Sequence, residues 1–260
     1  MPNNSAIGIF DSGVGGLSVF RQLKKAMPME HFIYLADQKN FPYGQKSRKE
    51  LQKISLENCQ FLLKQKAKLI IIACNSASCY SLKFLRTSIK IPIVGVVPAI
   101  KPAAILTKNS RIAILSTPAT SKSSYLKNLI SSFAKNTKVL NISAKGLEKA
   151  IENQDSKTIE ILLKKYYQKI QEFKADVLVL GCTHFPLILA KLKKEMPNLL
   201  VLDSSKAIAK RVNSILKTTD NLAREAKSDA FYTTANTNDF SKIASTLLKY
   251  KVKAKSAKIS

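Results

Sequence analysis

The chain alternates between short runs of apolar residues and longer stretches in which apolar residues recur at helical spacing. Unbroken apolar runs are typical of strands buried on both faces, and the recurring spacing is typical of helices with one buried face. The predicted strands are 6–10, 31–35, 69–73, 91–97, 111–115, 138–142, 177–180 and 199–203. The predicted helices are 17–26, one after Ser47, 75–86, 123–133, two within 147–173 that separate near 153–156, 187–196 and 207–216.

The helix after Ser47 has the clearest start signal. Ser47 followed by Glu50 matches a capping box, in which each side chain bonds the backbone N–H of the other residue. Because strands and helices alternate along the chain, the sequence predicts an α/β fold with mostly parallel sheets. Ligands bind such sheets at the carboxyl ends of the strands.

Two of the predicted strands end alike. The run IIIA is followed by Cys74, Asn75 and Ser76, and the run LVLG is followed by Cys182 and then Thr183-His184. Two similar α/β halves that each present one thiol at a strand end would place the thiols across a shared cleft. The pattern alone leaves coincidence open as the alternative.

The glycine-rich segment after the first predicted strand is a weaker signal. Gly13, Gly15 and Gly16 resemble a dinucleotide-binding loop, but the third glycine of that motif falls on Ser18. The match is therefore incomplete, and no phosphate-binding G-x-x-x-x-G-K-[ST] motif occurs elsewhere.

The four cysteines contain no C-x-x-C pair, so a zinc ribbon or a thioredoxin-like site is not expected. Cys182 and His184 could ligate a metal, but the only other histidine is His31, and no further cluster completes a ligand set. We therefore expect no metal. Cys59 and Cys79 are interpreted as small buried apolar residues.

The charge balance is strongly basic: 43 Lys and Arg stand against 17 Asp and Glu, a formal net charge of +26. Such a field attracts polyanions. Only six of the basic residues are arginines, which supply the forked donors that clamp phosphates and read bases, and the lysines are spread over nearly every predicted helix. We interpret the charge as a lysine-rich solvated surface, and a nucleic-acid partner as unlikely.

The 260 residues suffice for one large or two small domains. No apolar run approaches the length of a membrane span, so no membrane association is expected. Residues 1–5 are polar and lack a basic region followed by an apolar core, so no signal peptide and a cytoplasmic location are expected.

Five motifs in order make the chain closely resemble the glutamate racemases, of the aspartate/glutamate racemase group. They are FDSGVGGLSV at 10–19, Asp37 with PYG at 42–44, ACNSAS at 73–78, VGVVPAIKPA at 94–103 and GCTHFPL at 181–187. The resemblance extends from about residue 7 to about residue 216, and weakly to Leu248. It implies two similar three-layer α/β domains, with the active site in the cleft between them. The first would comprise 1–97 and 208–260, and the second 98–207.

The resemblance also implies cofactor-independent racemisation of glutamate, without pyridoxal phosphate or metal, by an enzyme that commonly forms homodimers. A thiolate and a thiol on opposite sides of the α-carbon remove the proton from one face and return one to the other. By resemblance, Cys74 acts on D-glutamate and Cys182 on L-glutamate. Asp11 matches an auxiliary residue near the first thiol, and His184 and Glu152 match auxiliary residues near the second.

A free thiol has a pKa of about 8.5, so a thiolate at neutral pH needs help, and helix N-termini after both strands are expected to give it. Asp11 would raise the pKa of a neighbouring thiol by repulsion, so we expect it to orient groups or relay protons.

The substrate carries two carboxylates and an ammonium, and the family matches place small polar residues around it. They are Asp11, Ser12, Tyr43, Gly44, Asn75, Ser76, Thr183 and His184, with Thr117 and Thr120 as secondary candidates for the carboxylates. Two departures stand out: Ser76 replaces the usual threonine, and residues 233–236 (TTAN) replace a Thr-Ser-Gly-Asp-like stretch. A racemase of aspartate or another acidic amino acid, and a further role on nucleic acid, remain as alternatives.

Overall fold

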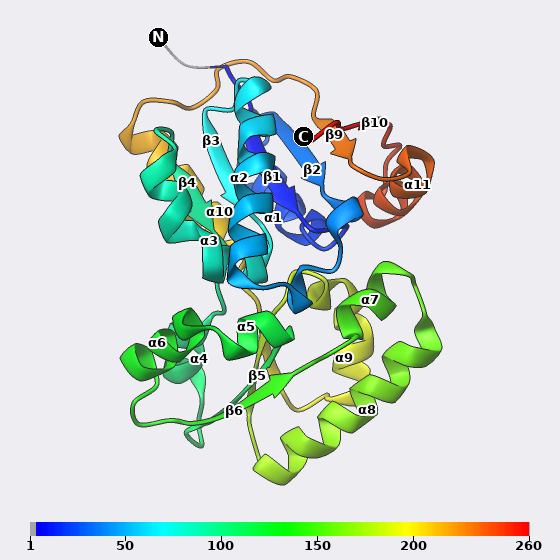
Figure 1. Ribbon diagram of the computed structural model, residues 1–260. Coiled ribbons are helices and arrows are strands. Elements are labelled where there is room, and N and C mark those ends of the chain that lie inside the picture. The colour runs from blue at the N-terminus through cyan, green and yellow to red at the C-terminus, as the bar shows by residue number, and fades with distance from the viewer. Residues whose placement is uncertain (1–3, 260) are drawn as a thin grey trace.

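The computed structural model describes residues 4–259, and it divides into two halves that each contain one parallel sheet (Figure 1). Residues 1–3, part of the polar start from which no signal peptide is expected, lie outside the described residues. All the strand pairs of both sheets are parallel, as the alternation of strands and helices predicts. The α/β fold class is confirmed.

The first sheet has six strands in the order β10-β9-β2-β1-β3-β4. Side chains alternate between the two faces of each strand, so each face is covered by its own helices. Helices α1, α10 and α11 pack on one face, and α2 and α3 on the other. The strands are β1 (Ile7–Asp11), β2 (Phe32–Ala36), β3 (Leu69–Ile72), β4 (Ile93–Gly95), β9 (Ala230–Thr233) and β10 (Ala254–Ser256). The helices are α1 (Leu17–Ala26), α2 (Arg48–Lys64), α3 (Asn75–Ser88), α10 (Ser205–Thr218) and α11 (Thr237–Leu248), with short 3-10 turns η1 (Gln38–Asn40) and η2 (Tyr43–Gln45).

The second sheet has four strands in the order β6-β5-β7-β8. Helices α4 and α6 pack on one face, and α7, α8 and α9 with the 3-10 turn η3 pack on the other. The strands are β5 (Arg111–Ser116), β6 (Lys138–Ser143), β7 (Val177–Gly181) and β8 (Leu200–Leu202). The helices are α4 (Ile100–Leu106), α5 (Pro118–Lys122), α6 (Ser124–Phe133), α7 (Leu147–Glu152), α8 (Ser156–Phe173) and α9 (Leu189–Glu195), with η3 (Phe185–Ile188).

The chain passes between the halves twice, and the two connections lie side by side. It leaves the first half after β4 and returns after β8. The Ser204 hydroxyl, on the returning connection, donates a hydrogen bond to the Val97 carbonyl on the outgoing one. All elements of the second half therefore fall between these two connections, whereas the first half is built from both ends of the chain.

The local signals of the sequence explain where several helices begin. Both halves of the capping box are present at the start of α2: the Glu50 N–H donates to the Ser47 hydroxyl, and the Ser47 N–H donates to the Glu50 carboxylate. The helical region 147–173 separates into α7 and α8 as expected, and Asp155 caps α8.

The structure departs from the predicted elements in several places, among them the short helix α5, which was not predicted. The predicted helix 187–196 is a 3-10 turn, η3, which has Pro186 in its first turn, followed by the shorter helix α9. Helix α4 was not predicted. Neither were β9, α11 and β10, which extend the first sheet beyond β2.

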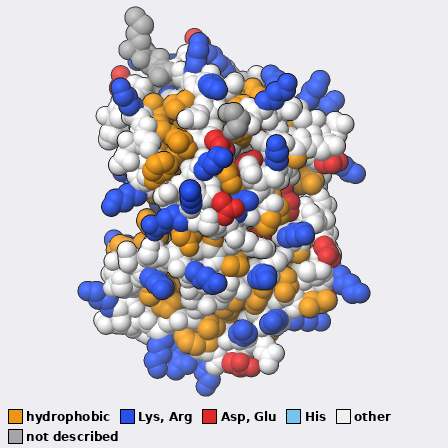
Figure 2. Space-filling model, viewed as in Figure 1, with side chains coloured by type: hydrophobic (Ala, Val, Ile, Leu, Met, Phe, Trp, Pro, Cys, Tyr) orange, Lys and Arg blue, Asp and Glu red, His pale blue; other side chains and the backbone are white. Residues whose placement is uncertain are grey.

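Lysine and arginine side chains are scattered over both halves of the face in Figure 2, with no single basic patch on that face. This distribution fits the interpretation of the charge as a solvated surface. Within residues 4–259, no helix combines the length and the apolar character that crossing a membrane would require.

Candidate active site

The carboxyl ends of strands from both sheets meet at a cavity between the halves. Asp11 ends β1, Cys74 follows β3 and Cys182 follows β7. The cavity brings together both thiols and most of the polar residues that the sequence predicts for the site. Its lining consists of Ser12, Phe41, Tyr43, Gly44, Cys74, Asn75, Ser76, Thr117, Glu148, Cys182, Thr183 and His184.

Cys74 is the N-cap residue of α3, and its side chain is buried. Burial raises the pKa of its thiol well above the ordinary value, and the nearby Asp11 carboxylate raises it further. Backbone N–H groups of Ala77 and Ser76, in the first turn of α3, act in the opposite direction. The helix N-terminus therefore helps the thiolate, as expected, but its effect is smaller than that of burial.

Cys182 belongs to the second half and directly follows β7. Its Sγ atom is 3.9 Å from Nδ1 of His184. Burial raises the pKa of the Cys182 thiol, and His184 opposes that rise. The expected help from an α-helix is absent at this position, because Cys182 leads into η3 instead. The imidazole of His184 takes over that role.

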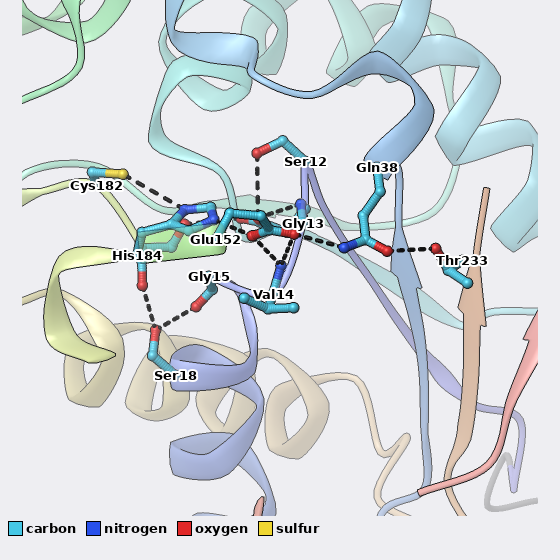
Figure 3. A network of polar contacts seen from close by, with 12 residues as sticks. Ser12, Gly13, Val14, Gly15, Ser18, Gln38, Glu152, Cys182, His184 and Thr233 are labelled. Carbon is cyan, nitrogen blue, oxygen red and sulfur yellow. Dashed lines mark hydrogen bonds and ion pairs between the residues drawn. The ribbon is translucent and has the colours of Figure 1, made fainter. Parts of the chain in front are cut away.

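His184 and Glu152 form a buried ion pair, with Nε2 2.7 Å from Oε2 (Figure 3). Although burial alone would lower the pKa of His184, its contacts with Cys182 and Glu152 raise it well above its ordinary value. Burial would likewise raise the pKa of Glu152, but hydrogen bonds from His184, Gln38 and the Val14 N–H lower it. The pair is therefore ionised, and it places a cation beside the Cys182 thiol.

Asp11 is not a lining residue, but it connects the two halves next to the cavity through Thr183. Its carboxylate accepts hydrogen bonds from the Gly13 N–H at 3.0 Å and from the Thr183 hydroxyl at 2.9 Å, with the Ser12 hydroxyl at 3.4 Å. Burial raises the pKa of Asp11, and its neighbours only partly offset that rise. A carboxyl in this state can hold a proton close to Cys74.

Three hydroxyl groups gather beside Asn75. The Ser76 hydroxyl is 2.8 Å from that of Thr117 and 3.4 Å from that of Thr120. Thr117 caps α5 by accepting from the Thr120 N–H. The buried side-chain amide nitrogen of Asn75 has no hydrogen-bond partner in the described chain. These groups supply neutral donors for an anionic ligand, which is the role that the sequence suggests for them.

Tyr43 and Gly44, both on η2, also line the cavity. The Tyr43 hydroxyl is already engaged: it donates to Asp37 at 2.5 Å and accepts from Asn58 at 2.8 Å. Tyr43 therefore contributes its ring to the wall while its hydroxyl points into this network. Gly44 lies against the carboxyl group of Glu148, which would collide with a side chain at this position.

The glycine-rich segment after β1 serves to pack the loop against the site. A Cβ atom on Gly13 would lie 2.5 Å from the Glu152 carboxylate oxygens. The Ser18 hydroxyl, at the position of the missing third glycine, donates to the carbonyls of Gly15 and Thr183. The loop thus follows the buried side chains of the site closely, which accounts for its glycines without a dinucleotide.

Gln38 and Glu148 are site residues that the sequence analysis missed. The Gln38 amide donates to Glu152 at 2.6 Å, and its carbonyl oxygen accepts from the Thr233 hydroxyl at 2.8 Å (Figure 3). Thr233 belongs to the divergent stretch 233–236, so β9 connects to the Glu152–His184 pair through Gln38. Only the position of Gln38 next to Asp37 could have suggested it, and nothing in the local sequence separates Glu148 from the exposed acidic residues of the chain.

We expect Gln38→Ala to lower kcat/KM about tenfold for the racemisation that the sequence resemblance implies, because the ionised carboxylate of Glu152 loses a hydrogen bond. Steady-state kinetics in both directions measure this effect. The matched control is Gln171→Ala, which removes an exposed bond to the Tyr167 hydroxyl far from the cavity. Equal activities of the two variants would contradict a supporting role for Gln38.

Within residues 4–259, no group of three or more His, Cys, Asp or Glu side chains is arranged to hold a metal ion. The remaining thiols, Cys59 and Cys79, lie outside the cavity lining. Burial raises the pKa of Cys59 to about 12 and that of Cys79 to about 11.

Known proteins match the chain over most of its length. A glutamate racemase of Shewanella denitrificans is 43% identical over 213 residues, which cover 80% of this chain and 77% of the relative. The fold matches a glutamate racemase of Bacillus anthracis with a TM-score of 0.88 and 29% identity, over 98% of both chains. It also matches the glutamate racemase of Francisella tularensis in complex with D-glutamate, with a TM-score of 0.84 and 28% identity, over 99% of this chain and 97% of the other.

The family model described as Asp/Glu/Hydantoin racemase matches residues 7–212, which include β1, both cavity cysteines and the His184–Glu152 pair. Together with the relatives, this match makes the chain an amino-acid racemase, a member of the Asp/Glu/Hydantoin racemase family.

Proposed function

We propose that the chain interconverts L-glutamate and D-glutamate by a two-base proton transfer between Cys74 and Cys182. The observation that carries this proposal is the shared cavity, to which each half contributes one buried thiol at the end of a strand. Racemisation needs one base on each face of the α-carbon, and in the proposal the two thiols, one from each half, meet that need. The glutamate racemases matched above support glutamate as the substrate.

The surroundings of each thiol supply a place for its proton. Both thiols have raised pKa values, so a thiolate forms only where a neighbouring group stabilises it or accepts the proton. At Cys182, the imidazolium of His184, held by Glu152, stabilises the thiolate. At Cys74, Asp11 is the proton acceptor, because its own pKa is raised by burial. In the proposed cycle one cysteine removes the α-proton as a thiolate while the other donates a proton as a thiol.

Recognition of the substrate relies on neutral donors. No lysine or arginine is among the residues that line the cavity. In the proposal, the amide of Asn75 and the hydroxyls of Ser12, Ser76 and Thr117 bind the carboxylates, with Thr120 supporting Thr117 and Thr183 holding Asp11. The narrow wall formed by Tyr43 and Gly44 limits the length of the side chain.

The proposal extends to the setting of the reaction. The D-glutamate would be used for peptidoglycan synthesis in the cytoplasm, by an enzyme that needs neither pyridoxal phosphate nor metal and that acts as a homodimer. The division into domains 1–97 with 208–260, and 98–207, belongs to the same proposal. Size-exclusion chromatography with light scattering tests the dimer, and a monomer at all concentrations would refute it.

Circular dichroism of L-glutamate and D-glutamate, each incubated with the purified protein, tests the function. The signal is expected to decay to zero from both sides in buffer without pyridoxal phosphate, and equally with a chelator present. Parallel samples with L-aspartate are expected to keep their signal. If only the signal of aspartate decays, aspartate replaces glutamate as the substrate. If the signals of both amino acids stay unchanged, the proposal is refuted.

A further inference from the structure

Glu148, the second residue of α7, is a buried acid whose carboxyl group has no hydrogen-bond partner among the described residues. The residue is 3% exposed, and its carboxyl group is part of the cavity lining, against Gly44. Within residues 4–259, neither of its side-chain oxygens has a hydrogen-bond partner. All other acidic side chains of the cavity region are held: Asp11 by Thr183 and Gly13, and Glu152 by His184 and Gln38.

A buried carboxyl group without partners is costly, and the cost is greatest when it is ionised. Several titratable groups surround Glu148: His184 and Cys182 from the end of β7, Tyr166 from α8, Tyr43 from η2 and Glu152 one turn further along α7. The only cation among them is His184, which is already paired with Glu152. Burial therefore raises the pKa of Glu148 to about 7, and His184 only partly opposes that rise.

The charge of the substrate favours the neutral form of Glu148 still further. Glutamate carries one net negative charge, and the His184–Glu152 pair contributes none. An ionised Glu148 would add repulsion in a cavity whose lining contains no lysine or arginine. A protonated carboxyl instead supplies one O–H donor, which a carboxylate can accept.

We propose that Glu148 is a substrate-binding residue that, as a neutral carboxylic acid, donates a hydrogen bond to a carboxylate of the bound amino acid. This inference rests on the proposed function, and it adds a contact that the resemblance to known racemases does not supply. The two side-chain oxygens of Glu148 then gain hydrogen-bond partners when the substrate binds. The O–H donates to the substrate, and the carbonyl oxygen can accept from the substrate or from water.

The proposal fixes the sign of a pH dependence. Above the pKa of Glu148, the free enzyme must take up a proton to bind the substrate, so KM rises with pH by at most about tenfold per pH unit. Below that pKa this contribution is constant. Other groups of the site titrate as well, but they are the same in a variant that changes only Glu148.

The test compares the wild type with Glu148→Gln and Glu148→Ala, and with Glu172→Gln as a matched control on the exposed face of α8. KM and kcat are measured in both directions from about pH 6 to about pH 9. The glutamine amide keeps an N–H donor and cannot ionise. We expect Glu148→Gln to retain the low-pH KM and to lose the rise at high pH. We expect Glu148→Ala to raise KM about tenfold or more at low pH, with a smaller change in kcat.

If the wild type racemises glutamate, three results would still refute the proposed role of Glu148. One is a KM that neither variant changes. Another is a KM of Glu148→Gln at low pH as high as that of Glu148→Ala, which would indicate that Glu148 acts as a carboxylate that accepts a hydrogen bond from the substrate ammonium. The third is a fall in kcat alone, which would indicate action on the proton of Cys182. A wild type that fails to racemise glutamate would instead refute the proposed function, and this inference with it. Thermal melts of all variants identify any loss of folding.

Discussion

Replacement of either cavity cysteine with alanine is expected to abolish racemisation in both directions, by at least about a thousandfold. Each variant lacks one of the two groups that must remove or return the α-proton, and no neighbouring side chain can take the place of the thiol. Both residues are small and buried, and the change to alanine removes only a sulfur atom. Cys74→Ala and Cys182→Ala should therefore keep the fold, as measured by thermal melting.

Isotope exchange separates the roles of the two thiols. In D₂O, a variant with one remaining thiol can still exchange the α-proton of the enantiomer that this thiol faces. On the assignment carried over from the family, Cys74→Ala should lose exchange from D-glutamate and Cys182→Ala should lose it from L-glutamate. NMR of the α-proton measures both rates. A variant that keeps full two-way turnover would refute the two-base assignment.

Cys59→Ala and Cys79→Ala are the matched controls. Neither thiol lines the cavity, and Cys59 lies on the buried face of α2, in the apolar core. Both variants should retain activity, with a loss of stability of about 1 kcal/mol for the cavity left at Cys59. Loss of turnover with normal stability in either variant would show that the reactive thiols are misassigned.

Glu152→Gln is expected to lower kcat about a hundredfold, most strongly in the direction that starts from L-glutamate. The glutamine keeps the size of the side chain but removes the negative charge that helps to raise the pKa of His184. That pKa falls, so the imidazole loses its proton at a lower pH, and the thiolate of Cys182 loses its stabilising cation. The alkaline limb of the pH–rate profile should therefore move to lower pH.

The control for this change is Glu160→Gln, which removes an exposed ion pair with Lys191 on α8 and α9. It should alter neither kcat nor the pH profile, because exposed pairs contribute little. A Glu152→Gln profile with its alkaline limb unmoved would mean that the protonation of His184 does not govern the step.

The sequence predicted those strands and helices whose buried residues form a regular local pattern of apolar positions. Helix α2 begins at its capping box, and the continuous apolar runs of β1, β3, β5 and β7 form the centres of the two sheets. Strand β10 could not be predicted in this way. Its three residues, Ala254–Ser256, are mostly exposed, and the strand exists because it pairs with β9. Strand β9 in turn depends on the edge of β2.

The residues of the site likewise fall into two groups: those that the local sequence predicts, and those that depend on contacts between distant segments. Residues next to strand ends, such as Cys74, Cys182 and Asp11, could be located from their position in the sequence, and the cavity contains or adjoins them. Gln38 and Glu148 could not, because their importance comes from contacts between distant segments: Gln38 with Thr233, and Glu148 with Gly44. A charge on an amphipathic helix is normally solvated, and only the facing half of the molecule reveals that Glu148 is buried.

The side-by-side connections at Val97 and Ser204 make the second half an insertion within the first, and this has a consequence for synthesis on the ribosome. The inserted half has all its strands as soon as residue 202 is made, so it can fold while the chain is still growing. The outer half must wait, with the edge of β2 unpaired until β9 emerges. Nascent chains that stall in between would carry a folded second half and a first sheet whose β2 edge is unpaired and prone to aggregation. These are the species on which a chaperone would act.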